Sequence, residues 1–112
     1  MLENVSIRDL AAAVERGEPV VDVRTPEEYA TGHVPSAVLL PMHLVPLRLD
    51  DFRTDTPAYV VCEVGSRSWQ VGMFLAEHGI PSRNVIGGTA EWRSAGLPLD
   101  TGLPPGIGAS TG

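Results

Sequence analysis

The sequence has little cysteine and little basic charge, and both shortages limit what the protein can be. Its single cysteine cannot form an internal disulfide, so the fold does not depend on oxidation. Eight basic side chains against fourteen acidic ones give a formal net charge of -6, which disfavours binding to nucleic acid and to anionic membranes. The chain also lacks an apolar run long enough to span a bilayer, and its N-terminus lacks the apolar stretch of a signal peptide. We therefore expect a cytoplasmic protein that binds neither nucleic acid nor membranes.

The length and composition of the chain predict one globular domain followed by a short tail. The 112 residues suffice for one hydrophobic core, and 43% hydrophobic with 20% charged residues is typical of a soluble protein. From about residue 101 onward the sequence is rich in Pro, Gly, Ser and Thr and has no periodicity. We expect a domain over residues 1–100 and a flexible tail over residues 101–112.

Short apolar segments alternate with helical segments along the domain. Strands are predicted over residues 19–23, 37–41, 58–62 and 84–88, and helices over 6–17, 25–32, 68–79 and 89–96. Capping boxes are expected at Ser6 with Asp9 and at Thr25 with Glu28, and Thr89 is expected to cap the last helix. Residues 43–52 contain a proline and predict a short or broken helix. Strands separated by helices run parallel, so the sequence predicts an α/β fold.

The single cysteine, Cys62, follows a strand and precedes a helix. A free cysteine in such a place can be an ordinary small core residue. However, ligands of parallel sheets bind at the carboxyl ends of the strands, where Cys62 is expected. Gly65 allows a tight loop with inward N–H groups, the next helix begins there, and Arg67 adds a positive charge. Because each of these features stabilises a thiolate, we interpret Cys62 as a nucleophile.

Three segments follow one another along the chain: VVDVRTPEEYATGHVPSAVLLP, VVCEVGSRS and VIGGTAEW. Together they resemble a single-domain rhodanese, a sulfurtransferase, over about residues 5–98. The resemblance implies a rhodanese-like α/β fold, with a central five-stranded parallel sheet flanked by helices on both faces. It also implies a cysteine that takes sulfane sulfur from thiosulfate or another donor, becomes a persulfide and passes the sulfur to a thiophile. No metal or organic cofactor is expected.

The resemblance assigns a role to each matching residue. The nucleophile is Cys62, and the loop expected to bind the substrate consists of Glu63, Val64, Gly65, Ser66, Arg67 and Ser68. The supporting residues are Asp22, Arg24, His33, Gly87 and Gly88. Asp22 and Arg24 are expected to brace the loop, although they could instead form a surface ion pair. His33 is expected to tie down a loop and not to act as an acid or base.

Two positions depart from the family pattern, and the loop length argues against phosphatase chemistry. Ser36 replaces a glycine of the family, which affects a turn and not the chemistry. Glu63 occupies a position that is often basic, and an inward carboxylate would disfavour an anionic donor such as thiosulfate. Alternatively, Glu63 points to solvent or pairs with an arginine. Four residues separate Cys62 from Arg67, against five in cysteine-dependent phosphatases, so the loop suits one sulfur atom better than a tetrahedral oxyanion.

Two functions remain open at this point. The first is a sulfurtransferase that uses a small sulfur donor and a thiol or cyanide-like acceptor, or a sulfur-carrier protein as acceptor. The second is a rhodanese-like module for sulfur relay or protein docking, with little turnover on small donors.

Overall fold

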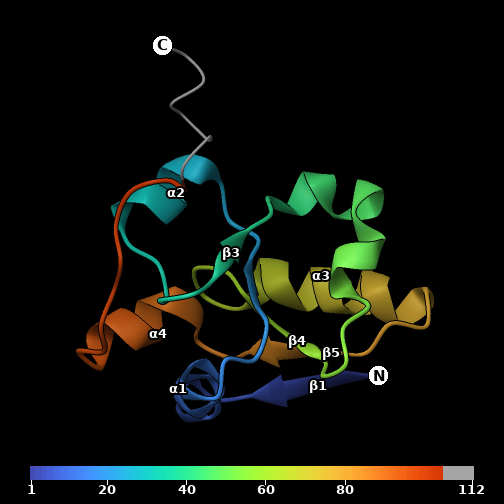
Figure 1. The fold of residues 1–112 in the computed structure, drawn as a ribbon, viewed down its shortest axis with the longest axis horizontal. Coiled ribbons are helices and arrows are strands. Elements are labelled where there is room, and N and C mark those ends of the chain that lie inside the picture. The colour runs from blue at the N-terminus through green and yellow to red at the C-terminus, as the bar shows by residue number, and fades with distance from the viewer. Residues whose placement is uncertain (105–112) are drawn as a thin grey trace.

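The computed structural model describes residues 1–104 and has one five-stranded sheet, in which every pairing of neighbouring strands is parallel (Figure 1). The strand order is β1-β5-β4-β2-β3. The strands are β1 Leu2–Val5, β2 Val20–Asp22, β3 Val38–Leu39, β4 Ala58–Val61 and β5 Ser82–Val85. The α-helices are α1 Ile7–Glu15, α2 Pro26–Thr31, α3 Ser66–Glu77 and α4 Gly88–Ser94, and two 3-10 helices span Met42–Leu47 (η1) and Leu49–Phe52 (η2). The predicted α/β fold with a parallel sheet is confirmed.

Helices cover both faces of this sheet. Successive residues of the central strand β4 point to opposite faces, so they pack into different buried clusters. Val60 of β4 belongs to a buried cluster with Val71 and Leu75 of α3 and with residues of η1 and η2. Its neighbours Tyr59 and Val61 belong to a second cluster, which contains side chains of α1 and α4. Figure 1 shows α1 and α4 on one side of the sheet and α3 on the other. The protein therefore has two apolar layers, one on each face of β4.

One strand was not predicted from the pattern of residues. β1 pairs with β5 in the register Leu2 with Ser82 through Val5 with Val85. Its two central residues are polar and exposed because the strand lies at the edge of the sheet, so the segment has no strong apolar signal. β5 itself begins two residues earlier than expected and ends at Val85, before the paired glycines.

The predicted helix starts are correct for two helices and wrong for a third. Ser6 and Thr25 cap α1 and α2 through complete capping boxes. The expected cap at Thr89 is wrong, because Gly87 in a left-handed conformation precedes α4. The Thr89 side chain is buried and its hydroxyl has no hydrogen-bond partner among the described residues. Two 3-10 helices replace a regular helix over 42–52, as the proline in this segment predicted.

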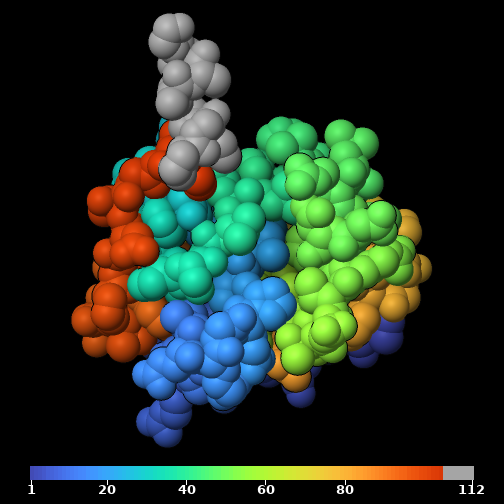
Figure 2. Space-filling view, viewed as in Figure 1, coloured from blue at the N-terminus to red at the C-terminus, as the bar shows by residue number. Residues whose placement is uncertain are grey.

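The segment after α4 returns along the surface to α2, as Figure 2 shows in red beside the blue-green part of the chain. Trp92 Nε1 donates to the carbonyl of Pro98 at 2.7 Å, and His33 and Asp100 exchange two backbone hydrogen bonds. Gly102 N–H donates to the carbonyl of Ala30. The first residues of the predicted tail are thus attached to the domain, and residues 105–112 of that tail lie outside the described residues.

The start of α4 lies directly against the backbone that follows β4. Thr89 N–H donates to the carbonyl of Cys62, and Ala90 N–H donates to the carbonyl of Glu63, both at 2.9 Å. Gly88 has φ +57°, and a Cβ at this position would lie 2.4 Å from the carbonyl oxygen of Cys62. Only glycine allows this contact, so the paired glycines let α4 support the loop that begins at Cys62.

We predict that Gly88→Ala destabilises the protein far more than Gly17→Ala. Both glycines have positive φ, but a Cβ at Gly17 would meet nothing within 4 Å. The backbone strain of an alanine at positive φ lowers the unfolding free energy by about 1–2 kcal/mol at either position. The clash of its Cβ at position 88 lowers it by about 1–3 kcal/mol more. Urea unfolding of the two variants measures the difference. Equal losses of unfolding free energy would show that the close approach of α4 does not matter.

Candidate active site

Cys62 lies at the carboxyl end of the central strand β4, and its sulfur is enclosed by the loop that follows. The residue has no exposed surface and packs with the apolar cluster beneath α3. Its Sγ accepts hydrogen bonds from the backbone N–H groups of Gly65 at 3.1 Å and Ser68 at 3.3 Å. Ser68 Oγ also lies 3.3 Å from Sγ. The cysteine is therefore as buried as a core residue, yet it is surrounded by hydrogen-bond donors that an ordinary core thiol lacks.

The loop takes this shape because Gly65 adopts a left-handed conformation directly before α3. Its φ is +105°, and its carbonyl accepts from Trp69 N–H in the first turn of the helix. The first N–H groups of a helix have no partner within the helix. The N–H of Ser68, in the first turn of α3, donates to the sulfur instead. The positive end of the helix dipole therefore lies at the sulfur, where it stabilises negative charge.

The predicted loop residues divide into three groups. Cys62, Gly65 and Ser68 meet at the sulfur, as described above. The side chains of Val64 and Ser66 are exposed, and Val64 is 61% exposed. Glu63 and Arg67 direct their charges to other side chains, so the sulfur is held chiefly by backbone N–H groups.

Arg67 forms a two-pronged ion pair with Glu28 of α2. The two guanidinium nitrogens lie 2.8 and 2.9 Å from the two carboxylate oxygens. This hydrogen bonding from Arg67 is the main reason that the pKa of Glu28 falls to about 2, and the capping contact with Thr25 also lowers it. Arg67 therefore contributes a compensated charge near the loop, and it ties the start of α3 to the start of α2.

The buried residues Asp22 and Arg24 form an ion-pair network with the partly exposed Glu63 of the loop. Arg24 is 1% exposed, and its guanidinium contacts Asp22 at 2.9 Å, Glu63 at 3.1 Å and the carbonyl of Gly32 at 2.8 Å. The alternative that Asp22 and Arg24 form a surface ion pair is wrong, because both are buried. The contact of Arg24 with Glu63 agrees with the expected role of bracing the Cys62 loop. Glu63 also pairs with Arg93 of α4 at 3.0 Å. Of the two positions considered for Glu63, the structure has the one in which it pairs with arginine.

His33 is not among the hydrogen-bond partners of the Cys62 sulfur, and its own contacts hold a loop in place. Its Nδ1 lies 2.8 Å from the carbonyl of Tyr29, and its ring stacks on the Tyr29 ring with centroids 3.6 Å apart. Its backbone pairs with Asp100. These contacts agree with the expected structural role.

Two residues at the site carried no recognisable signal in the sequence. Glu28 was expected only as a helix cap, and its ion pair with Arg67 spans 39 residues of sequence. Asn84 was expected only as the first residue of a strand, yet its side chain is buried and accepts a hydrogen bond from Ser68. Neither contact follows from local spacing, because each joins separate elements.

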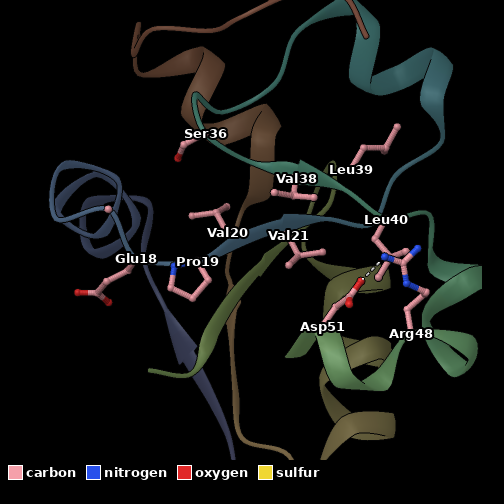
Figure 3. A pocket seen from close by; sticks show the side chains of 11 residues that line it. Glu18, Pro19, Val20, Val21, Ser36, Val38, Leu39, Leu40, Arg48 and Asp51 are labelled. Carbon is pink, nitrogen blue, oxygen red and sulfur yellow. Dashed lines mark ion pairs between the residues drawn. The ribbon is translucent and has the colours of Figure 1, made fainter. Parts of the chain in front are cut away.

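The pocket in Figure 3 is separate from the Cys62 loop. It has a volume of about 390 Å³ and lies along the edge strand β3 and the amino end of β2, with the Arg48–Asp51 ion pair at its side. No residue from 62 to 68 lines it.

Over residues 1–104, no cluster of His, Cys, Asp or Glu could hold a metal ion. Among the same residues, none of the helices has the length and apolar composition of a membrane span.

These features define a class of protein: an α/β domain with one buried cysteine held by N–H groups at a strand-to-helix loop. The chain belongs to the rhodanese-like domain family, whose model matches residues 6–95. A sulfurtransferase of Allochromatium vinosum is 35% identical, over 88% of this chain and 95% of the relative. The thiosulfate sulfurtransferase GlpE of Pseudomonas entomophila is 32% identical, over 82% and 85% of the two chains.

Two further matches show how the domain occurs elsewhere. The crystal structure of a rhodanese-like domain protein from Staphylococcus aureus is 34% identical and superposes with a TM-score of 0.76, covering 90% of this chain and 99% of that one. A transcriptional regulator of Mycobacterium tuberculosis, Rv0324, is 34% identical over 84% of this chain, which spans only 43% of the regulator. The domain therefore occurs both alone and within a longer protein.

We predict that the Glu28–Arg67 ion pair stabilises the fold at neutral pH and fails in acid. Because the pKa of Glu28 is lowered to about 2, its contribution is complete above its ordinary pKa of 4.5 and is lost as the pH falls toward about 2. Both side chains are about one-third exposed, so solvent screening keeps the effect small. Unfolding free energies of wild type and Glu28→Gln should converge as the pH falls through this window.

The neighbouring exposed carboxylate supplies the control for this measurement. Glu27 forms no ion pair with another described residue, so Glu27→Gln should track wild type across the whole pH range. A difference between wild type and Glu28→Gln that stays constant from neutral to acid pH would contradict the prediction.

Proposed function

We propose that the protein is a sulfurtransferase that carries sulfur as a persulfide on Cys62. The observation that carries this proposal is the pair of backbone N–H groups, from Gly65 and Ser68, that donate to Sγ. Such donors stabilise a sulfur anion without a nearby free cation, and the start of α3 adds its dipole. These two N–H groups suit both the thiolate and the persulfide anion.

In the first step the Cys62 thiolate attacks the sulfane sulfur of the donor. A new sulfur–sulfur bond forms to Sγ while the donor's own bond to that sulfur breaks. The leaving group departs with the bonding electron pair, as sulfite from thiosulfate or as a thiolate from a persulfide. The N–H groups of the loop hold the resulting Cys62 persulfide anion.

In the second step an acceptor removes the outer sulfur. A thiolate or a cyanide-like nucleophile attacks the terminal sulfur atom, the bond to Sγ breaks and the Cys62 thiolate returns. The electron count closes within donor, cysteine and acceptor, so the cycle proposed here uses no metal or organic cofactor. A sulfur-carrier protein could accept the sulfur by the same step.

Burial of Cys62 favours a small donor. Because the residue has no exposed surface, a reagent reaches the sulfur only when the structure around it opens. Thiosulfate or a small persulfide needs a smaller opening than a folded protein does. Glu63 does not argue against thiosulfate as strongly as its position in the sequence suggested, because Arg24 and Arg93 compensate its charge.

The proposed location is the cytoplasm. A catalytic thiolate has to stay reduced between turnovers, and reducing compartments maintain that state. The similarity to the relative named thiosulfate sulfurtransferase supports thiosulfate as a donor.

The second candidate is a module for sulfur relay or protein docking. Slow access to the buried Cys62 would keep turnover on small donors low, which is the behaviour expected of this candidate. The regulator that contains a related domain within a longer chain is consistent with such a use. Turnover on small donors separates the two candidates.

We predict that Cys62→Ser abolishes sulfur transfer and leaves the fold intact. A serine hydroxyl fills nearly the same space and still accepts the loop N–H groups, but it forms no persulfide. Intact-mass spectrometry after treatment with thiosulfate or a persulfide donor should show one added sulfur atom on wild type and none on the variant. Cyanide should then remove the added mass.

A donor panel completes the experiment. Steady turnover with thiosulfate or a small persulfide supports the enzyme, whereas sulfur uptake without turnover supports the relay module. Transfer by Cys62→Ser at the wild-type rate would rule out both forms of the proposal.

A further inference from the structure

A buried hydrogen-bonded chain runs from the Cys62 sulfur to the edge of the sheet. Ser68 Oγ, 3.3 Å from Sγ, donates to Asn84 Oδ1 of β5 at 2.5 Å. Asn84 Nδ2 in turn donates to Asn4 Oδ1 of β1 at 3.1 Å. Ser68 has no exposed surface and Asn84 is 4% exposed, whereas Asn4 is exposed. Three elements thus contribute polar side chains that connect the sulfur with solvent.

The direction of these hydrogen bonds decides what Ser68 can do for the sulfur. A serine hydroxyl has one proton to donate and two lone pairs that accept. Because the proton points to Asn84, a lone pair of Ser68 faces Sγ. In this arrangement the thiol of Cys62 donates its proton to Ser68, while the two backbone N–H groups donate to the sulfur. The chain as observed therefore suits protonated Cys62.

A thiolate or a persulfide anion requires the opposite direction. A negative sulfur has no proton to donate, and a serine lone pair facing it is repulsive. If only the Ser68 hydroxyl turned to the sulfur, the buried Asn84 Oδ1 would lose its donor, which is costly. A half-turn of the Asn84 amide avoids this loss, because Nδ2 then donates to Ser68 and Oδ1 accepts from the exposed amide of Asn4.

We propose that Asn84 is a positioning residue for the Cys62 sulfur, whose amide orientation decides whether Ser68 accepts a proton from the thiol or donates one to the sulfur anion. The inference rests on the proposed function in taking Cys62 as the reactive group. Asn84 acts only through Ser68. The orientation of its amide sets how readily the Cys62 anion forms. The amide turns over when the anion appears.

The charged residues that form ion pairs at the loop make no hydrogen bond to the side chain of Asn84, which is bonded to Ser68 and Asn4. Arg67 of α3 pairs with Glu28 of α2, Arg24 pairs with Asp22 and Glu63, and Arg93 of α4 pairs with Glu63. Substitutions at position 84 leave all of these pairs in place. A change in the ionisation of Cys62 in such variants therefore reports on the hydrogen-bonded chain.

The test compares two substitutions that should act in opposite directions. Asn84→Asp can only accept when ionised, so it keeps the Ser68 proton away from the sulfur and adds a negative charge. Asn84→Leu removes the competing acceptor, so the Ser68 hydroxyl can donate to the sulfur. We expect the pH midpoint of Cys62 ionisation to rise by about one unit in the first variant, a tenfold change in the thiolate fraction, and to fall in the second.

The ultraviolet absorbance of the thiolate gives this midpoint without any reagent entering the buried site. Because the chain has one cysteine, subtraction of the Cys62→Ala titration isolates the signal. Asn4→Asp provides a variant at an exposed position that does not disturb the core. Its carboxylate accepts from Asn84 Nδ2 and holds the observed orientation, so the midpoint should rise and should stay raised in high salt, which screens a direct charge effect.

Ser82→Ala is the matched control. Ser82 lies on the same strand as Asn84 and is equally buried, but its hydroxyl has no hydrogen-bond partner among the described residues. The midpoint should not move in this variant. Shifts of the midpoint in the same direction for Asn84→Asp and Asn84→Leu would overturn the proposal. An unchanged midpoint in both of these variants, or in Asn4→Asp, would also overturn it.

Sulfur uptake in the same preparations keeps this inference separate from the proposed function. Opposite midpoint shifts with no sulfur uptake from any donor by wild type would support the positioning role and reject the sulfurtransferase. Sulfur uptake by wild type without opposite shifts would reject the positioning role and leave the sulfurtransferase standing.

Discussion

The buried guanidinium of Arg24 is the contact on which the arrangement of the site depends. A buried cation needs partners for all its donors, and removing one partner typically costs about 3–5 kcal/mol. Here the partners come from separate segments: Asp22 at the end of β2, the carbonyl of Gly32 after α2, and Glu63 in the Cys62 loop. Through Glu63 the network continues to Arg93 of α4. One side chain thus fixes the positions of the loop, the end of α2 and the start of the segment after β2.

The sulfur is held by dipoles while the charges around it are paired among themselves. Gly65 and Ser68 donate backbone N–H groups to Sγ. Arg67 instead forms an ion pair with Glu28, and Glu63 forms ion pairs with Arg24 and Arg93. Fixed dipoles suit the proposed reaction, in which negative charge would move between Sγ and an outer sulfur, because they need not reorganise. The ion pairs serve to keep these dipoles in position by joining the loop to α2, β2 and α4.

Most of the fold could be predicted from local patterns, and the failures have physical causes. The strands at Val20–Asp22 and Ala58–Val61 are buried throughout and rich in β-branched residues because both of their faces are covered, and they were recognised. The edge strand Leu2–Val5 was missed because its polar residues face solvent and its pairing partner lies about eighty positions away. Thr89 has the chemistry of a helix cap, but Gly87 and Gly88 already form the turn, so its side chain is buried instead.

The sequence by itself determined the class of the fold, the position of Cys62 at a strand-to-helix loop and the family resemblance, because these depend on residues that are close in the chain. Only the tertiary structure decided where the charges and hydrogen bonds go. Glu63 could have faced a donor or an arginine, and only the positions of β2 and α4 place Arg24 and Arg93 beside it. Likewise, nothing local indicates that Asn84 reaches Ser68. That contact exists because α3, which carries Ser68, packs against β5, and the packing of distant elements is set by the whole domain.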